Sequence, residues 1–158
     1  MPDVDVMMIG HFARDRNIVD GHGEEAPGGA VYYGSIALRR LGLRVAVVTR
    51  LHPDDFSLLD ELRDEGVEVF ATPGPQTSGI ANYYDSADME GRVCVPLGFA
   101  GPIRPADIPD VVARVYAVVP IIAGEVDLQL LEQLHKRGPV ALDVQGFVRV
   151  REESDGTN

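Results

Sequence analysis

Apolar and polar residues follow two different periods along the chain, and the two periods alternate. Short, mostly apolar runs, typical of strands buried on both faces, cover residues 4–10, 44–49, 67–70, 115–120 and 140–144. Apolar residues at helical spacing occupy residues 29–41, 53–66 and 125–138, with Asp54 or Asp55 expected near the N-cap of the second helix. The alternation predicts an α/β fold with a mainly parallel sheet covered by helices.

One part of the chain departs from this alternation. The segments GIANYYD (79–85) and GRVCVPL (91–97) both alternate apolar and polar residues, and the loop SADMEG separates them. This pattern predicts an antiparallel hairpin inserted into the α/β fold, in the position of a lid or flap. Ligands of parallel sheets bind at the carboxyl ends of the strands, where Gly10, Gly124 and Asp143 are expected.

The net charge and the cysteine content indicate which partners and which cellular compartment to expect. The 158 residues include 14 Lys and Arg against 25 Asp and Glu, and the net charge of −11 would repel nucleic acid. Cys94 is the only cysteine, so no internal disulfide forms and a reducing cytoplasm is expected. The N-terminal segment MPDVDVMMIG lacks a basic region and carries acids, which is unlike a signal peptide or a membrane span. We therefore expect a cytoplasmic protein.

Two features that could mark a ligand site do not predict one here. GHGEEA (21–26) has the spacing of a dinucleotide fingerprint, but it lies about a dozen residues after the first predicted strand, so a flexible turn is the better interpretation. The histidines do not have the spacing of metal ligands, and no metal site is predicted from His11, His22, His52 and His135.

Gly28 and Gly29 form the barest backbone in the chain, directly before a predicted helix. One interpretation is a turn that leads into the helix, which is the most common use of such a pair. The other is that a ligand touches the backbone where any Cβ would collide, with the N–H groups of the helix facing it. Composition alone does not decide between these two interpretations.

The order of these motifs resembles a known family. VMMIGHFARD followed by PGGAVYYGSIALRRLG is similar to the opening of the ribokinase-like, or PfkB, family of carbohydrate kinases. The resemblance continues through the hairpin at 79–97, AGEV (123–126) and VALDVQGFVR (140–149), and it covers essentially the whole chain. It implies a three-layer α/β/α fold with a mainly parallel sheet and an inserted β lid. The lid strands are expected near residues 16–20, 79–85 and 91–97.

The resemblance also implies which residues bind substrate. Asp15 matches the carboxylate that binds sugar hydroxyls in this family, and a carboxylate accepts hydroxyl hydrogen bonds well. Gly28 and Gly29 match glycines that lie against the substrate, near the hinge of the lid. Glu125 matches a position that reaches the sugar from the next strand end, although an acid there also suits the N-cap region of a helix.

The chain departs from the ribokinase pattern at two positions. Tyr33 and Ala13 stand where ribokinases commonly carry asparagine, which makes ribose itself an unexpected acceptor. Tyr33 is a further candidate substrate residue. With Tyr32 it either stacks on a sugar ring or packs between the helix and the lid, and packing is favoured because aromatic side chains bury large areas.

The family's Asn-x-x-Glu and Gly-Ala-Gly-Asp motifs, which carry the anion hole and the base, do not occur in the chain. The resemblance therefore implies that residues 1–158 are the N-terminal part of a kinase domain, without its C-terminal half and without a catalytic residue. The expected activity is ATP-dependent phosphorylation of a sugar or polyol by the parent kinase, with ATP and Mg²⁺ as cofactors of that parent and this chain supplying the substrate-binding half. The alternative is a non-catalytic polyol-binding or regulatory half-domain. A homodimer through the lid or an exposed sheet edge is also expected.

Overall fold

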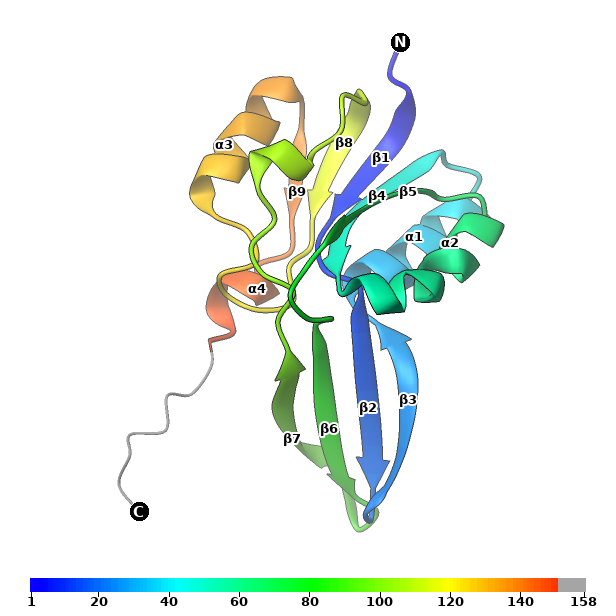
Figure 1. The fold of residues 1–158 in the computed structure, drawn as a ribbon, viewed down its shortest axis with the longest axis vertical. Coiled ribbons are helices and arrows are strands. Elements are labelled where there is room, and N and C mark those ends of the chain that lie inside the picture. Colours follow the sequence, from blue (N-terminus) through cyan, green and yellow to red (C-terminus); the bar gives the residue numbers. More distant parts are fainter. Residues whose placement is uncertain (151–158) are drawn as a thin grey trace.

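The computed structural model describes residues 1–150, and these residues form two sheets (Figure 1). The strands of the larger sheet are all parallel. In spatial order they are β5 (Glu68–Pro73), β4 (Val45–Leu51), β1 (Val4–Ile9), β8 (Ala113–Val118) and β9 (Val140–Leu142). The smaller sheet is called the lid below. Its strands, in spatial order, are β3 (His22–Gly28), β2 (Ala13–Val19), β6 (Gly79–Asp85) and β7 (Asp88–Gly98).

Helices cover both faces of the parallel sheet, as Figure 1 shows. The helices α1 (Ala30–Arg40) and α2 (Asp60–Asp64), with the 3₁₀ helix η1 (Pro53–Leu59), lie on one face, and α3 (Leu128–Arg137) lies on the other. Met7 and Ile9 of β1 belong to the core beside α3, whereas Met8 belongs to the core beside α1. Burial on both faces explains why these strands are mostly apolar. The predicted three-layer α/β/α fold is confirmed.

The helix predicted over residues 53–66 is wrong in part. The chain forms η1 first and only then the short α2. His52, rather than Asp54 or Asp55, is the N-cap residue, and its Nδ1 accepts a hydrogen bond from the backbone N–H of Asp54 at 3.3 Å. Pro53 follows at the first helical position, where its missing N–H costs nothing.

Residues 21–26, interpreted above as a flexible turn, belong mostly to a regular strand. β3 pairs antiparallel with β2 along its whole length, from His22 opposite Val19 to Gly28 opposite Ala13. Its first four residues are exposed, so no apolar face produces the alternation by which strands are recognised. An edge strand of this kind has little sequence signature.

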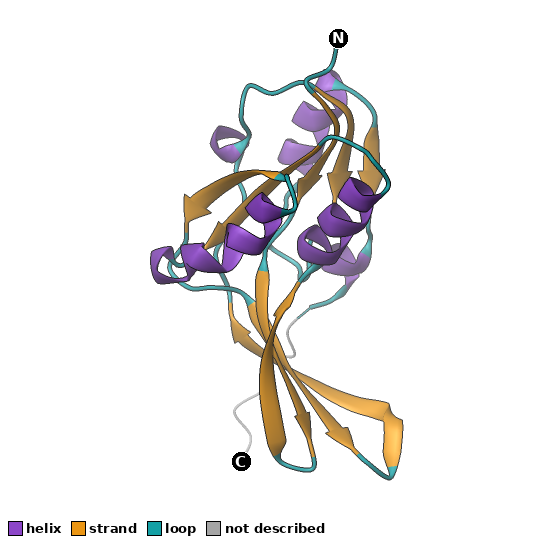
Figure 2. Ribbon diagram, turned by 90° about the vertical axis from the view of Figure 1, so that its right-hand side faces the viewer, coloured by secondary structure: helices purple, strands orange, loops and turns teal. Residues whose placement is uncertain are grey.

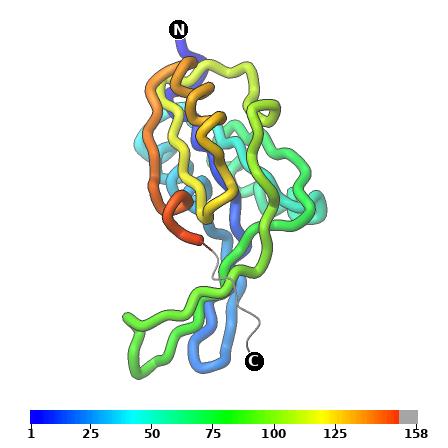
Figure 3. The backbone as a smooth tube through the Cα atoms, turned by 90° about the vertical axis from the view of Figure 1, so that its left-hand side faces the viewer, coloured from blue at the N-terminus to red at the C-terminus, as the bar shows by residue number. Residues whose placement is uncertain are grey.

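The lid projects from the carboxyl-terminal end of the parallel sheet, away from the helical layers (Figure 2). The chain crosses between the two sheets four times: at residues 10–12, at residue 29, at residues 74–78 and after residue 98. Two short helices, η2 (Pro105–Asp107) and α4 (Gln145–Val148), complete the described chain, and Figure 3 shows α4 close to the base of the lid. Among the described residues, no helix has the length and apolar character needed to cross a membrane.

Candidate functional site

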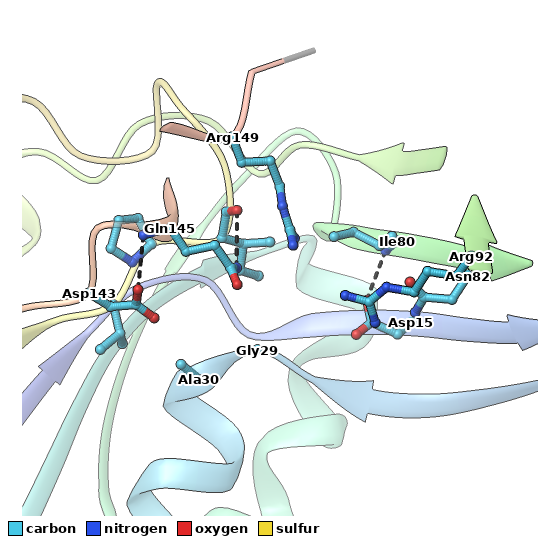
Figure 4. Close-up of a pocket in the computed structure, with 12 residues that line it drawn as sticks. Asp15, Gly29, Ala30, Ile80, Asn82, Arg92, Asp143, Gln145 and Arg149 are labelled. Atoms are coloured by element: carbon cyan, nitrogen blue, oxygen red, sulfur yellow. Dashed lines mark hydrogen bonds between the residues drawn. The ribbon is translucent and has the colours of Figure 1, made fainter. Parts of the chain in front are cut away.

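A cavity of about 220 Å³ lies between the lid and the carboxyl ends of the parallel strands (Figure 4). This volume is several times the ~30 Å³ that one water molecule occupies in the liquid. The lid contributes Asp15, Ile80, Asn82 and Arg92. The other wall consists of Gly29, Ala30, Val119, Pro120, Ile121, Asp143, Gln145 and Arg149. The cavity thus lies at the end of the sheet where parallel folds bind ligands.

Asp15 is held in place by the backbone of the neighbouring lid strand. Its Oδ1 accepts a hydrogen bond from the backbone N–H of Ile80 at 2.8 Å. Burial raises the pKa of the Asp15 carboxyl, while the N–H of Ile80 and the positive charge of Arg149 act in the opposite direction. The second oxygen, Oδ2, lies against Gly28, where any Cβ would collide with it. The carboxylate is therefore fixed in orientation at the cavity wall.

The glycine pair has two separate roles. Gly28 leaves room for the Asp15 carboxylate and is buried, whereas Gly29 itself lines the cavity. Gly29 has φ of 85°, and a Cβ there would lie 2.5 Å from the carbonyl oxygen of His11. It is also the N-cap of α1 and provides no side-chain cap, so the positive end of the helix faces the cavity. Gly29 thus forms a tight turn and also lines the cavity, and a ligand contact at its backbone stays a prediction.

The opposite wall is a short polar loop after β9. Asp143 accepts a hydrogen bond from the backbone N–H of Gln145 through Oδ1 at 2.9 Å. The Nε2 group of Gln145 lies 3.4 Å from the carbonyl oxygen of Ile121. Arg149 ends α4, and its carbonyl oxygen accepts from the backbone N–H of Ala123 at 2.9 Å. Its side chain extends into the cavity toward the lid, as Figure 4 shows.

A row of polar side chains crosses the inner face of the lid. Asn17, Asn82 and Cys94 are cross-strand partners on β2, β6 and β7. The Nδ2 group of Asn82 donates to Oδ1 of Asn17 at 3.1 Å, and Sγ of Cys94 lies 3.3 Å from Oδ1 of Asn82. Arg92 stands beside this row, with Nη1 3.5 Å from the hydroxyl of Tyr84. Of these residues, Asn82 and Arg92 line the cavity, so the lid presents an amide and a guanidinium group to it.

Glu125 is fully buried and is not part of the cavity lining. Its carboxylate accepts hydrogen bonds from the backbone N–H groups of His11 and of Ile121, the latter at 2.8 Å. Burial raises the pKa of Glu125 to about 7, against the effect of these N–H donors. It does not cap α3 either, because Asp127 is the N-cap and accepts from the N–H of Leu130 at 2.8 Å. The structure thus places Glu125 behind the cavity wall, beneath a residue that lines it.

Tyr33 also lies outside the cavity lining. Its side chain is exposed, and its hydroxyl donates to the carbonyl oxygen of Pro27 in β3 at 2.9 Å. Tyr32 is buried, packs edge-on against Phe12, and donates to Glu61 of α2 at 2.7 Å. The favoured packing interpretation therefore agrees with the structure for Tyr32, whereas Tyr33 is mostly exposed and a substrate contact by it stays a prediction.

Of the predicted substrate residues, the structure brings Asp15 and Gly29 into one cavity, with Gly28 directly beneath Asp15. The sequence pattern did not identify the lid residues Asn82 and Arg92, or Gln145 and Arg149 at the two ends of α4. A signal existed for the lid pair, because both are polar positions within the alternating hairpin. Among residues 1–150, no group of three or more His, Cys, Asp or Glu side chains could hold a metal ion.

Comparison of the sequence with protein-family models and with curated proteins finds no match. Comparison of the fold with solved structures finds close matches. A sulfate complex of a pyrophosphate-dependent kinase in the ribokinase family has a TM-score of 0.86 and 35% identity, covering 93% of this chain and 52% of that chain. A pyrophosphate-dependent kinase of the same family, complexed with a pyrophosphate analog and myo-inositol, has a TM-score of 0.85, 34% identity and the same coverage.

A third match is a pyrophosphate-dependent myo-inositol-1 kinase that was converted by mutation into a myo-inositol-3 kinase. It has a TM-score of 0.82 and 31% identity, and the match covers 93% of this chain and 50% of that chain. The chain therefore spans about half the length of each of these proteins. Together, the parallel sheet, the inserted lid and these matches show that the chain belongs to the ribokinase-like family of kinases.

Proposed function

We propose that the chain is the acceptor-binding half of a kinase that phosphorylates a cyclic polyol, and that its cavity binds myo-inositol or a close relative. The observation that carries this proposal is the mixture of charges around the cavity. Asp15 and Asp143 offer hydrogen-bond acceptors, and Arg92 and Arg149 offer donors. Within the described chain, none of the four forms an ion pair.

A polyol suits this arrangement because every hydroxyl both donates and accepts a hydrogen bond. Bonds from hydroxyls to carboxylates, and from guanidinium groups to hydroxyl oxygens, are charge-assisted and stronger than neutral ones. The carboxylate of Asp15 is held by the backbone N–H of Ile80 and lines the cavity, where it can accept a hydrogen bond from a hydroxyl. Two solved relatives, one complexed with myo-inositol and one named as a myo-inositol-1 kinase, support this substrate class.

We propose that the phosphate donor binds to the other half of the kinase fold, the half of the solved relatives that lies outside their match to this chain. Phosphoryl transfer needs positioned phosphates, a metal ion and an oriented nucleophile. ATP with Mg²⁺ is the proposed donor in the parent protein, and pyrophosphate, the donor named for the relatives, is the other donor to test. The metal is assigned to no residue, because the described part of the chain has no cluster that would hold it.

The lid also exposes an apolar outer face. Tyr83, Val93, Val95 and Leu97 alternate with the inward residues and are each more than one third exposed. A face of this kind would pair with the same face of a second copy, so the proposed homodimer would form here.

Residues 1–158 are expected to bind myo-inositol without transferring phosphate to it. The binding arm is a calorimetric titration with myo-inositol, ribose and adenosine, in which myo-inositol should bind most tightly. The transfer arm supplies Mg²⁺ with ATP or with pyrophosphate and measures product release in the presence of each acceptor. Acceptor-dependent turnover would contradict the half-site role, and failure to bind any of the three acceptors would contradict the substrate class.

A further inference from the structure

His11 lies at the base of the lid and contacts all four chain crossings between the two sheets. It belongs to the first crossing, and its carbonyl oxygen lies against Gly29 in the second. Its Nδ1 is 2.8 Å from Oγ of Ser78 in the third, and its Nε2 is 2.8 Å from the carbonyl oxygen of Gly101 in the fourth. The imidazole is fully buried, and the ring of Phe99 packs edge-on against it, with 5.5 Å between centroids.

The hydrogen bonds of His11 define one arrangement of protons. A carbonyl oxygen only accepts, so Nε2 carries the proton and donates to Gly101. Burial lowers the pKa of His11 to about 4, so the ring is neutral near pH 7 and Nδ1 accepts from the hydroxyl of Ser78. Oγ of Ser78 in turn accepts from the backbone N–H of Ala100 at 3.1 Å. Every polar atom in this chain of bonds is paired.

Glu125 extends the network from the lid base to the cavity wall. It accepts from the backbone N–H of His11 and from that of Ile121, which lines the cavity. Its Oε2 also lies 3.5 Å from Nδ1 of His11. Because burial disfavours the charged forms of both groups, this contact joins a neutral imidazole to the carboxyl group and is not a salt bridge.

We propose that His11 is a positioning residue, which sets the angle of the lid over the acceptor through its bonds to Ser78 and Gly101. A change of the lid angle moves the crossings relative to one another, and a buried polar group that loses its partner is costly. The network therefore limits the lid to orientations in which Ser78, Gly101 and Glu125 remain bonded. The test of this proposal by ligand binding rests on the proposed function, whereas its test by the lid angle needs no ligand.

The test compares two buried serines. Ser78→Ala removes the hydroxyl that bonds His11. Ser35→Ala is the control, because it removes a buried hydroxyl of α1 that donates to the carbonyl oxygen of Tyr32 in the same helix at 3.1 Å. Spin labels are attached to cysteines at Ala87 in the lid turn and at Lys136 on α3, in a Cys94→Ser background. Pulsed electron paramagnetic resonance then measures the distribution of the label distance.

The background and Ser35→Ala are expected to give the same narrow distribution, and Ser78→Ala a broader or shifted one. Ser78→Thr keeps a hydroxyl and should restore the narrow distribution. His11→Gln provides an independent variant if Ser78→Ala does not fold, because it keeps a donor toward Gly101 but loses the imidazole acceptor. It too should broaden the distribution.

Titration with myo-inositol provides the second readout. Ser78→Ala should raise the dissociation constant about fivefold to tenfold, the factor that the loss of one buried hydrogen bond allows, and Ser35→Ala should leave it unchanged. Identical distance distributions for Ser78→Ala, His11→Gln and the background would overturn the positioning role. If the unsubstituted chain does not bind myo-inositol, the proposed function fails, and the distance distributions still decide the role of His11.

Discussion

Replacing Asp15 by alanine is expected to weaken the binding of myo-inositol by about 2–4 kcal/mol, because the carboxylate makes charge-assisted bonds to hydroxyls. The chain should remain folded, since Asp15 is only partly buried and its one hydrogen bond is to the N–H of Ile80. Calorimetric titration measures the affinity, and circular dichroism confirms the fold.

Asp20 provides a matched control for this prediction. It is also a lid aspartate, and its Oδ1 accepts from the backbone N–H of Ser86 at 3.1 Å, but it lies at the exposed tip of the lid. Asp20→Ala should leave the affinity unchanged. A folded Asp15→Ala variant that binds myo-inositol as tightly as Asp20→Ala would remove Asp15 from the site.

Replacing Gly29 by alanine is expected to lower the free energy of unfolding by about 2–4 kcal/mol, the sum of a left-handed backbone and a steric collision. Its φ is 85°, and the new Cβ would meet the carbonyl oxygen of His11 at 2.5 Å. This oxygen belongs to the backbone at the base of the lid, so it cannot move aside at low cost.

Gly42 separates the two contributions. It has the same φ of 85°, but nothing lies within 4 Å of a Cβ built there. Gly42→Ala should therefore cost only the conformational part, about 1 kcal/mol. Urea unfolding measures both variants, and equal losses for the two would show that the collision with His11 does not exist.

Much of the fold was predictable because burial leaves a direct record in the sequence. β1 is apolar apart from Asp5, since Met7 and Met8 pack into cores on opposite faces of the sheet. Gly42 follows Leu41, the C-cap of α1, with a positive φ, as its position predicted. The polar edge strand β3 was missed because exposed residues on both faces produce no periodic signal.

The candidate site was predictable only where a motif is local. Asp15 and Gly29 stand near each other in the sequence, and the resemblance to a family identified them together. Arg92 and Arg149 belong to segments far apart in the chain: strand pairing in the lid places Arg92 at the cavity, and the segment after β9 places Arg149 there. The bond between His11 and Glu125 joins residues 114 positions apart, so its structural role could not be read from a motif.

The cavity between the lid and the strand ends is proposed to bind the acceptor. Titration of ¹⁵N-labelled residues 1–158 with myo-inositol, followed by heteronuclear NMR, tests it at the level of single amides. The largest shift changes are expected at backbone amides around the cavity, those of Gly29, Ala30, Ile80, Ile121 and Gln145. Saturable shifts that leave these amides unchanged, or no shifts at all, would contradict the claim.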